Sequence, residues 1–309
     1  MKQILVTGSL AFDYIMDFPG VFSDHIMPDK IHQINLSFSV NTLKKHRGGT
    51  AGNIAYSLSL FQQPVAILSV AGKDFKEYAR ILENSHITTS YIKIIKEEST
   101  ASAFIMTDKN DNQISGFYPG ALKNASTLSI KRVDTKPHFV IISPDNPEAM
   151  TSFSKECQDL SLPYLFDPGM QLPRLTDKQL EIGARGATIV IGNDYEMSLL
   201  KSRLKIDVKI IITTLGPKGS LIQTNDQTLT IPPAKPQEVL DPTGAGDAYR
   251  AGFMAGYIRN FNLKICGQMG SVAAAYAIEK YGTQEHTFTL EEFKKRYSET
   301  FNEVLELEK

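Results

Sequence analysis

The sequence predicts an α/β protein built on a doubly wound, mostly parallel sheet. Short apolar runs, such as residues 3–8, 65–72 and 188–192, are typical of strands buried on both faces, and segments with helical spacing separate them. A second group, near residues 12–18 and 100–118, alternates apolar and polar side chains, as strands with one wet face do. We therefore expect one large α/β domain and a small β-sheet lid.

Composition narrows the class of ligand. The chain has 309 residues, 42% of them hydrophobic, which is enough for a sizeable core. Its 33 basic and 34 acidic residues give a net charge of −1, so we expect a small-molecule ligand and neither nucleic acid nor a membrane as partner. Cys157 and Cys266 lack metal-like spacing, and the N-terminus does not resemble a signal peptide. A cytoplasmic protein, as monomer or homodimer, is expected.

The lid is assigned to two segments that interrupt the large domain. The large domain is expected to comprise residues 1–11, 48–90 and 119–309. The lid comprises residues 12–47 and 91–118. Within it, alternation predicts strands at 31–43 and 91–96 and a hairpin that turns at 108–112.

From about residue 138 onward, buried strands alternate with helical segments. They are expected at Phe139–Ser143, Tyr164–Asp167, Thr188–Gly192 and Lys209–Thr213. Each is followed by a polar or turn element, and ligands collect at the carboxyl edge of a parallel sheet. We expect the functional site at this edge.

The clearest local motif runs from Asp241 to Gly252. Gly244, Ala245 and Gly246 are small enough for an anion to reach the backbone, whose N–H groups are unsatisfied in the first turn of a helix. Asp247 follows, placed to accept a proton from an attacking hydroxyl. The alternative is a plain helix N-terminus, where the macrodipole favours an acidic residue.

A second glycine-rich segment precedes a helix. Gly48 and Gly49 allow a ligand to approach the backbone, and the amide of Asn53 in the first turn can donate and accept hydrogen bonds with a sugar hydroxyl. A tight turn and helix start is the alternative explanation.

Two further elements suit phosphoryl transfer. Asn193 and Glu196, three residues apart, share a helix face where their oxygens can hold hydrated Mg²⁺; the alternative is a capping box. Thr214, Gly216 and Gly219 mark a glycine turn that can pass against the phosphates or ribose of a nucleotide, or be an ordinary turn.

With these motifs in place, the sequence resembles the ribokinase-like (PfkB) family of carbohydrate and nucleoside kinases over nearly its whole length. Residues 241–254 match the second family signature, and residues 48–55 with Gly72 match the first. Gln62 departs from the pattern, which usually has glycine or serine there. A left-handed backbone at Gln62 would cost roughly 1 kcal/mol.

The resemblance implies an ATP-dependent kinase and assigns roles to the motifs. Asp247 becomes the general base, and the amides from Gly244 through Ala245 and Gly246 to Asp247 form the anion hole. Mg²⁺ is implied at Asn193 and Glu196, directly or through water.

The remaining implied contacts surround the two substrates. ATP is bordered by Thr214, Gly216 and Gly219. The resemblance implies that Asp13, Gly49 and Asn53 bind the sugar hydroxyls of the acceptor. A monovalent-cation site, for K⁺, is implied near Asp241 and Gly282.

The acceptor is the harder question. Residues 12–19, 112–121 and 247–252 look like the adenosine and nucleoside kinase branch more than fructokinases. Four lid aromatics offer faces for a nucleobase or form the core of the lid. They are Phe12, Phe38, Phe117 and Tyr118.

We therefore expect 5′-phosphorylation of a ribonucleoside, with adenosine first. A kinase of a free sugar, such as ribokinase or fructokinase, is the alternative. A nucleotide-sensing binder without activity would have no use for Asp247. A dinucleotide dehydrogenase would need Gly-x-Gly-x-x-Gly after the first strand, which the sequence lacks.

Overall fold

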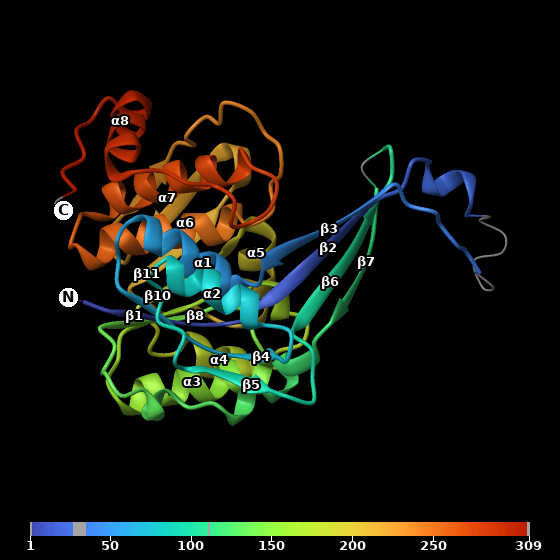
Figure 1. Ribbon diagram of the computed structural model, residues 1–309. Coiled ribbons are helices and arrows are strands. Elements are labelled where there is room, and N and C mark those ends of the chain that lie inside the picture. The colour runs from blue at the N-terminus through green and yellow to red at the C-terminus, as the bar shows by residue number, and fades with distance from the viewer. Residues whose placement is uncertain (1, 27–34, 111, 308–309) are drawn as a thin grey trace.

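A nine-stranded sheet and a four-stranded sheet form the framework of the computed structural model, which describes residues 2–26, 35–110 and 112–307. Helices cover both faces of the larger sheet, and the smaller sheet extends away from one of its edges (Figure 1). The expected doubly wound α/β fold with a small β-sheet is confirmed. Within the described ranges, none of the helices combines the length and apolar character needed to cross a membrane.

The large sheet is parallel except at one end. Its strands in spatial order are β13 (Thr228–Ile231), β12 (Ser220–Gln223), β11 (Ile210–Thr214), β10 (Ile189–Asn193), β9 (Tyr164–Phe166), β8 (Phe139–Ile142), β1 (Ile4–Thr7), β4 (Val65–Gly72) and β5 (Ile92–Ile95). Only the β11–β12 and β12–β13 pairings of this sheet are antiparallel. The order reverses between β1 and β8, and such a switch point is where open α/β sheets bind ligands.

The helices divide into two layers with separate cores. One layer consists of α1 (Thr50–Leu60), α2 (Lys76–Asn84), α6 (Ala245–Ile258), α7 (Leu263–Ile278) and α8 (Leu290–Phe301). The other consists of α3 (Pro147–Asp159), α4 (Asp177–Ala184) and α5 (Asp194–Arg203). The continuous apolar runs of the strands face both cores, as their lack of alternation predicts.

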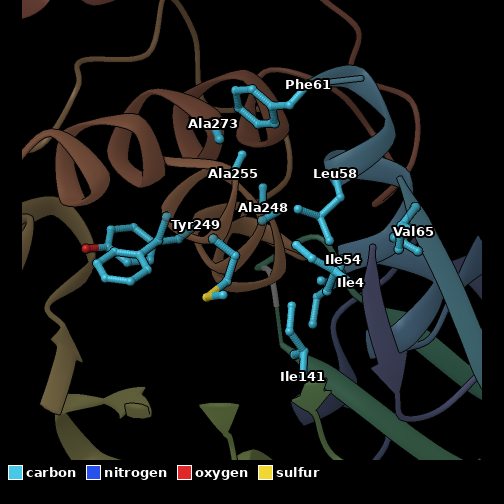
Figure 2. Packing of buried hydrophobic residues seen from close by; sticks show 14 of the residues in the cluster. Ile4, Ile54, Leu58, Phe61, Val65, Ile141, Ala248, Tyr249, Ala255 and Ala273 are labelled. Carbon is cyan, nitrogen blue, oxygen red and sulfur yellow. The ribbon is translucent and has the colours of Figure 1, made fainter. Parts of the chain in front are cut away.

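Packing between α1 and α6 positions the site. Figure 2 shows Ile54 and Leu58 of α1 beside the small residue Ala248 of α6, with Ile4 and Ile141 of the strands nearby, and all five side chains are fully buried. Burying each Ile or Leu contributes about 1.5–3 kcal/mol, and small residues opposite them let the helices approach closely. As a result, the first turns of α1 and α6 meet at the carboxyl edge of the sheet.

The lid sheet has the order β3-β2-β6-β7. Its strands are β2 (Ala11–Asp17), β3 (Thr42–Gly48), β6 (Ala101–Thr107) and β7 (Gln113–Tyr118). The hairpin expected around residues 108–112 is confirmed by antiparallel pairing of β6 with β7.

In the lid, one predicted strand is shorter than expected and another belongs to the large sheet. Residues 35–41 are not a strand, and β3 begins only at Thr42; residues 27–34 lie outside the described residues. The strand expected at 91–96 is β5, which pairs with β4 at the edge of the large sheet. Alternating polarity indicates only that one face of a strand is exposed to solvent. An edge strand of the large sheet shows this pattern as well as a strand of the lid does.

Three smaller features complete the fold. The hairpin of β12 and β13 was not expected, because its strands have only four residues each. Gln62 does adopt the left-handed conformation, with φ 54°. Cys157 and Cys266 are free and buried.

Candidate active site

The N-terminus of α6 presents unsatisfied amides. Gly244 caps the helix at φ 81°, in the left-handed region. The N–H of Ala248 donates to the carbonyl of Gly244 at 2.9 Å, whereas the amides of Gly246 and Asp247 have no backbone acceptor among the described residues. Free first-turn amides form a ready anion site. The geometry therefore suits the expected anion hole at Gly246 and Asp247, whereas the amide of Ala245 donates to the carbonyl of Pro242 at 3.3 Å.

Asp247 is held by a residue from the other glycine-rich motif. The Nδ2 of Asn53 donates to Oδ2 of Asp247 at 2.8 Å. The Oδ1 of Asn53 accepts from Oγ1 of Thr283 at 2.7 Å and from Nε2 of Gln284 at 2.9 Å. Because these partners occupy the amide of Asn53, its main role in this structure is to orient Asp247. Only its second N–H remains for the sugar contact expected from the sequence.

Thr283 and Gln284 were missed by sequence reasoning. Both are buried, and Gln284 also donates to the hydroxyl of Tyr78. That hydroxyl in turn donates to the carbonyl of Gly48 at 2.9 Å. No local motif marks Thr283 or Gln284, although they directly follow Gly282, which the resemblance had placed near the site.

Carboxylates gather around this network. Burial raises the pKa of Asp13 to about 6, and the nearby charges of Asp241 and Asp247 add to the effect. Burial also raises the pKa of Asp247, whereas Arg250 and the hydrogen bond from Asn53 act to lower it. The structure thus brings Asp13 and Asp247, which lie far apart in the sequence, into one site.

The glycines of the first motif make room for Asp13. A β-carbon at Gly48 would lie 2.3 Å from Oδ2 of Asp13. Gly49 has φ 87°, and a β-carbon there would lie 2.5 Å from the carbonyl oxygen of Ser9. A side chain at position 48 would displace the carboxylate of Asp13. At Gly49 the clash is with backbone and φ is positive, so glycine is required there for the backbone to pass this close.

The pleat of the lid separates the four aromatic candidates. In register across the sheet, Asp13 pairs with Ala103, which pairs with Phe117, so Asp13 and Phe117 share one face. Phe117 is 49% exposed there. It is the one of the four that lies on the face of the acidic site.

The other three aromatics have structural surroundings. Phe12 is buried on the opposite face, 5.7 Å from the ring of Tyr78. Tyr118 is also on that face and donates to Glu98 at 2.9 Å. Phe38 packs against the rings of Phe18 and Phe22. These surroundings favour the alternative left open by the sequence, the lid core, for Phe12 and Phe38. Phe12 and Tyr118 lie on the face opposite Asp13, because alternation along a strand sends neighbouring side chains to opposite faces.

Asn193 and Glu196 form the capping box that the sequence had left open. The Oδ1 of Asn193 accepts from the Glu196 amide at 2.8 Å, and Oε2 of Glu196 accepts from the Asn193 amide at 2.7 Å. The residues also fit a hydrated Mg²⁺, because the second carboxylate oxygen of Glu196 stays outside this box and Mg²⁺ in nucleotide sites keeps several waters. Within the described residues, no group of three or more His, Cys, Asp or Glu is arranged for a metal ion, so an all-protein cage is absent there.

The nucleotide turn adjoins Asn193. Thr214 pairs with Asn193 in register between β11 and β10. The amide of Leu215 donates to the carbonyl of Gly219 at 2.8 Å, closing the turn, and Gly216 faces open space at φ 55°. The structure therefore brings the two elements expected to serve ATP and Mg²⁺ together at the same edge.

The two residues of the expected cation site also meet. Oδ2 of Asp241 accepts from the amide of Gly282 at 3.0 Å, and Oδ1 accepts from the amide of Thr243 at 2.9 Å. The bond from Gly282 joins the loops that carry the two residues. A K⁺ site there stays a prediction.

Comparison with known proteins agrees with this geometry. The family model for pfkB family carbohydrate kinases matches residues 3–289, and the chain belongs to this family. It is therefore an ATP-dependent phosphotransferase with a hydroxyl group as acceptor.

Individual relatives are similar over almost the whole chain. A nucleoside kinase of Methanothermobacter thermautotrophicus is 33% identical over 310 residues, covering 96% of each protein. The structure of Burkholderia thailandensis nucleoside kinase in complex with inosine has a TM-score of 0.88 and 31% identity, covering 97% of this chain and 99% of that one. The structure of the same kinase with ADP and inosine has a TM-score of 0.85 and 32% identity, covering 97% of each chain.

Proposed function

We propose that this protein transfers the γ-phosphoryl group of ATP to the 5′-hydroxyl of a purine ribonucleoside, with adenosine as the first acceptor to test. One observation carries the choice of a nucleoside over a free sugar. Phe117 lies half-exposed on the same lid face as Asp13, so carboxylate and aromatic ring face the same space. A carboxylate suits ribose hydroxyls, and a ring face suits a purine. The nucleoside kinases among the relatives support this choice.

The proposed mechanism assigns one task to each group. Asp247, oriented by Asn53, accepts the proton of the acceptor hydroxyl as its oxygen bonds to the γ-phosphorus and ADP departs. The amides of Gly246 and Asp247 stabilise the charge on the transferred group. Bound Mg²⁺ supplies neutralisation of phosphate charge, and Glu196 would hold it through water. The lid closes over the acceptor and excludes water as a rival.

Replacing Phe117 by alanine tests the nucleoside assignment. The wild-type protein should turn over adenosine and inosine faster than ribose or fructose in a coupled ADP assay. Phe117→Ala should raise KM for nucleosides by about 2- to 10-fold, the loss expected for an aromatic contact of about 0.5–1.5 kcal/mol, and leave KM for ATP unchanged.

Phe104→Ala is the matched control for this measurement. Phe104 is 44% exposed, but it lies on the opposite face of the lid, stacked on Tyr14. Its KM for nucleosides should stay near that of the wild type. If a free sugar gave the highest kcat/KM, the sugar kinase alternative would replace the present proposal.

Glu196→Gln separates the magnesium role from the capping role. A glutamine at the third position still completes a capping box but holds hydrated Mg²⁺ less well. We expect the Mg²⁺ concentration for half-maximal rate to rise several-fold, with thermal stability nearly unchanged.

Glu292 provides the control, because it forms the equivalent capping box with Thr289 at the start of α8. Glu292→Gln should leave the magnesium titration unchanged. A titration of Glu196→Gln that superimposes on the wild type would assign Glu196 to capping alone.

A further inference from the structure

Helix α6 carries a buried arginine close to the proposed base. Arg250 is 7% exposed and lies three residues after Asp247, so both side chains are on one side of the helix. Arginine is rarely buried without a partner, because removing its charge from water is costly. The position of Arg250 therefore requires an explanation.

The guanidinium group reaches back to the first turn. Side chains on a helix lean toward its N-terminus. A β-carbon at Gly246 would lie 2.7 Å from Nη1 of Arg250, so the guanidinium packs directly against the backbone of the proposed anion hole. This end of a helix already carries positive partial charge, which disfavours a cation there.

Asp167 offsets this cost. It follows β9 at the carboxyl edge of the sheet, is 1% exposed, and places Oδ2 at 2.6 Å from Nε of Arg250. Burial acts to lower the pKa of Arg250, but the charges of Asp167 and Asp247 outweigh it and raise that pKa. Arg250 therefore stays charged throughout the working pH range.

Charged and titratable groups reach Asp247 from every element around it, and Arg250 is the cation among them. They are Arg250 on α6, Glu196 on α5, Asp13 on β2, Asp167 after β9 and the hydroxyl of Tyr78 on α2. Asp241, in the loop before α6, acts on Asp13. Asn53 on α1 is neutral. Without Arg250, Asp247 would face burial and several carboxylates, and both favour its protonated form.

We propose that Arg250, held by Asp167, is a positioning residue for phosphoryl transfer: it keeps the carboxylate of Asp247 ionised and fixes the first turn of α6 beside it. The inference rests on the proposed role of Asp247 as base. It adds an electrostatic partner that acts through Asp247 without itself accepting the proton.

The pH dependence of kcat/KM tests this role. A base works only when ionised, so activity falls as pH drops through the pKa of Asp247. Arg250→Met removes the cation, and the acidic limb should move to higher pH by about 1–3 units, the range for loss of an opposite charge nearby. Arg250→Lys retains a charge and should move it less. Asp167→Asn breaks the same ion pair but keeps the guanidinium, so the limb should stay in place or move to lower pH.

The two kinds of variant distinguish electrostatics from folding. Both break one buried ion pair and should lower the thermal midpoint. If the ion pair had only a structural role, the acidic limbs of the Arg250→Met and Asp167→Asn profiles would both coincide with the wild-type limb. That result would overturn the inference. If Arg250→Met does not fold, Arg250→Lys is measured in its place. An acidic limb of Arg250→Lys that coincides with the limb of Asp167→Asn would then overturn the inference.

Failure of the proposed function is recognised separately. The profile is measured with whichever acceptor the substrate panel ranks first, so a wrong nucleoside assignment leaves this test intact. An Asp247→Asn variant with near wild-type activity would remove the base, and this inference with it. An inactive Asp247→Asn variant together with unmoved limbs in the Arg250 variants would contradict only the role of Arg250.

Discussion

Replacing Asp247 by asparagine is expected to lower kcat by 10²–10⁴-fold, or roughly 3 to 5.5 kcal/mol of barrier, the usual contribution of general-base catalysis. Asparagine keeps the size of the side chain, and its Oδ1 can still accept the hydrogen bond from Nδ2 of Asn53. It cannot take the proton of the acceptor. Affinities for ATP and nucleoside should therefore change little, and steady-state kinetics will show the loss in kcat.

The alternative is that Asp247 only favours the start of a helix. Glu148→Gln is the control, because Glu148 is an exposed acidic residue in the first turn of α3 and lies outside the site. It should cost at most about 1 kcal/mol of stability and leave kcat unchanged. If Asp247→Asn retained more than about a tenth of wild-type kcat, the loss would be about 1.4 kcal/mol or less, too small for a base.

Gly244→Val is expected to have the second largest effect. Gly244 adopts φ 81°, and a β-carbon there would meet Cβ of Thr283 at 3.0 Å. A branched side chain therefore strains the turn and pushes against a residue that holds Asn53. Losing one donor of such an anion hole typically costs 10²–10³-fold in kcat, and we expect a fall of about that size.

Gly186→Val controls for backbone strain in this experiment. Gly186 has φ 82°, almost the same conformation, but lies between α4 and β10, where a β-carbon would meet Cγ of Gln158 at 3.2 Å. Both variants should lose stability in thermal unfolding, whereas only Gly244→Val should lose kcat. Equal kinetic losses in the two variants would mean that strain, and not the anion hole, explains the effect.

Local patterns in the sequence were sufficient for the framework. Mostly apolar runs such as Val65–Gly72 predict strands buried on both faces, because neither face of such a strand has enough polar side chains to lie in water. The first-turn glycines before Asp247 likewise predict unsatisfied amides, since the geometry of a helix start is local. Asp247 and Asn53 were proposed as site residues in this way, whereas the role of Asp13 came only from the resemblance to the family.

The tertiary structure decided which residues meet. The partners of Asn53, Thr283 and Gln284, lie some 230 residues away in the chain. The partner of Arg250 is Asp167, which follows β9. Periodicity could not tell which sheet β5 joins or that Phe117, and not Tyr118, shares a face of the lid with Asp13. Periodicity encodes only whether a side chain is buried, whereas these contacts depend on how α1 packs on α6 and on the register of the lid strands, which long-range packing alone determines.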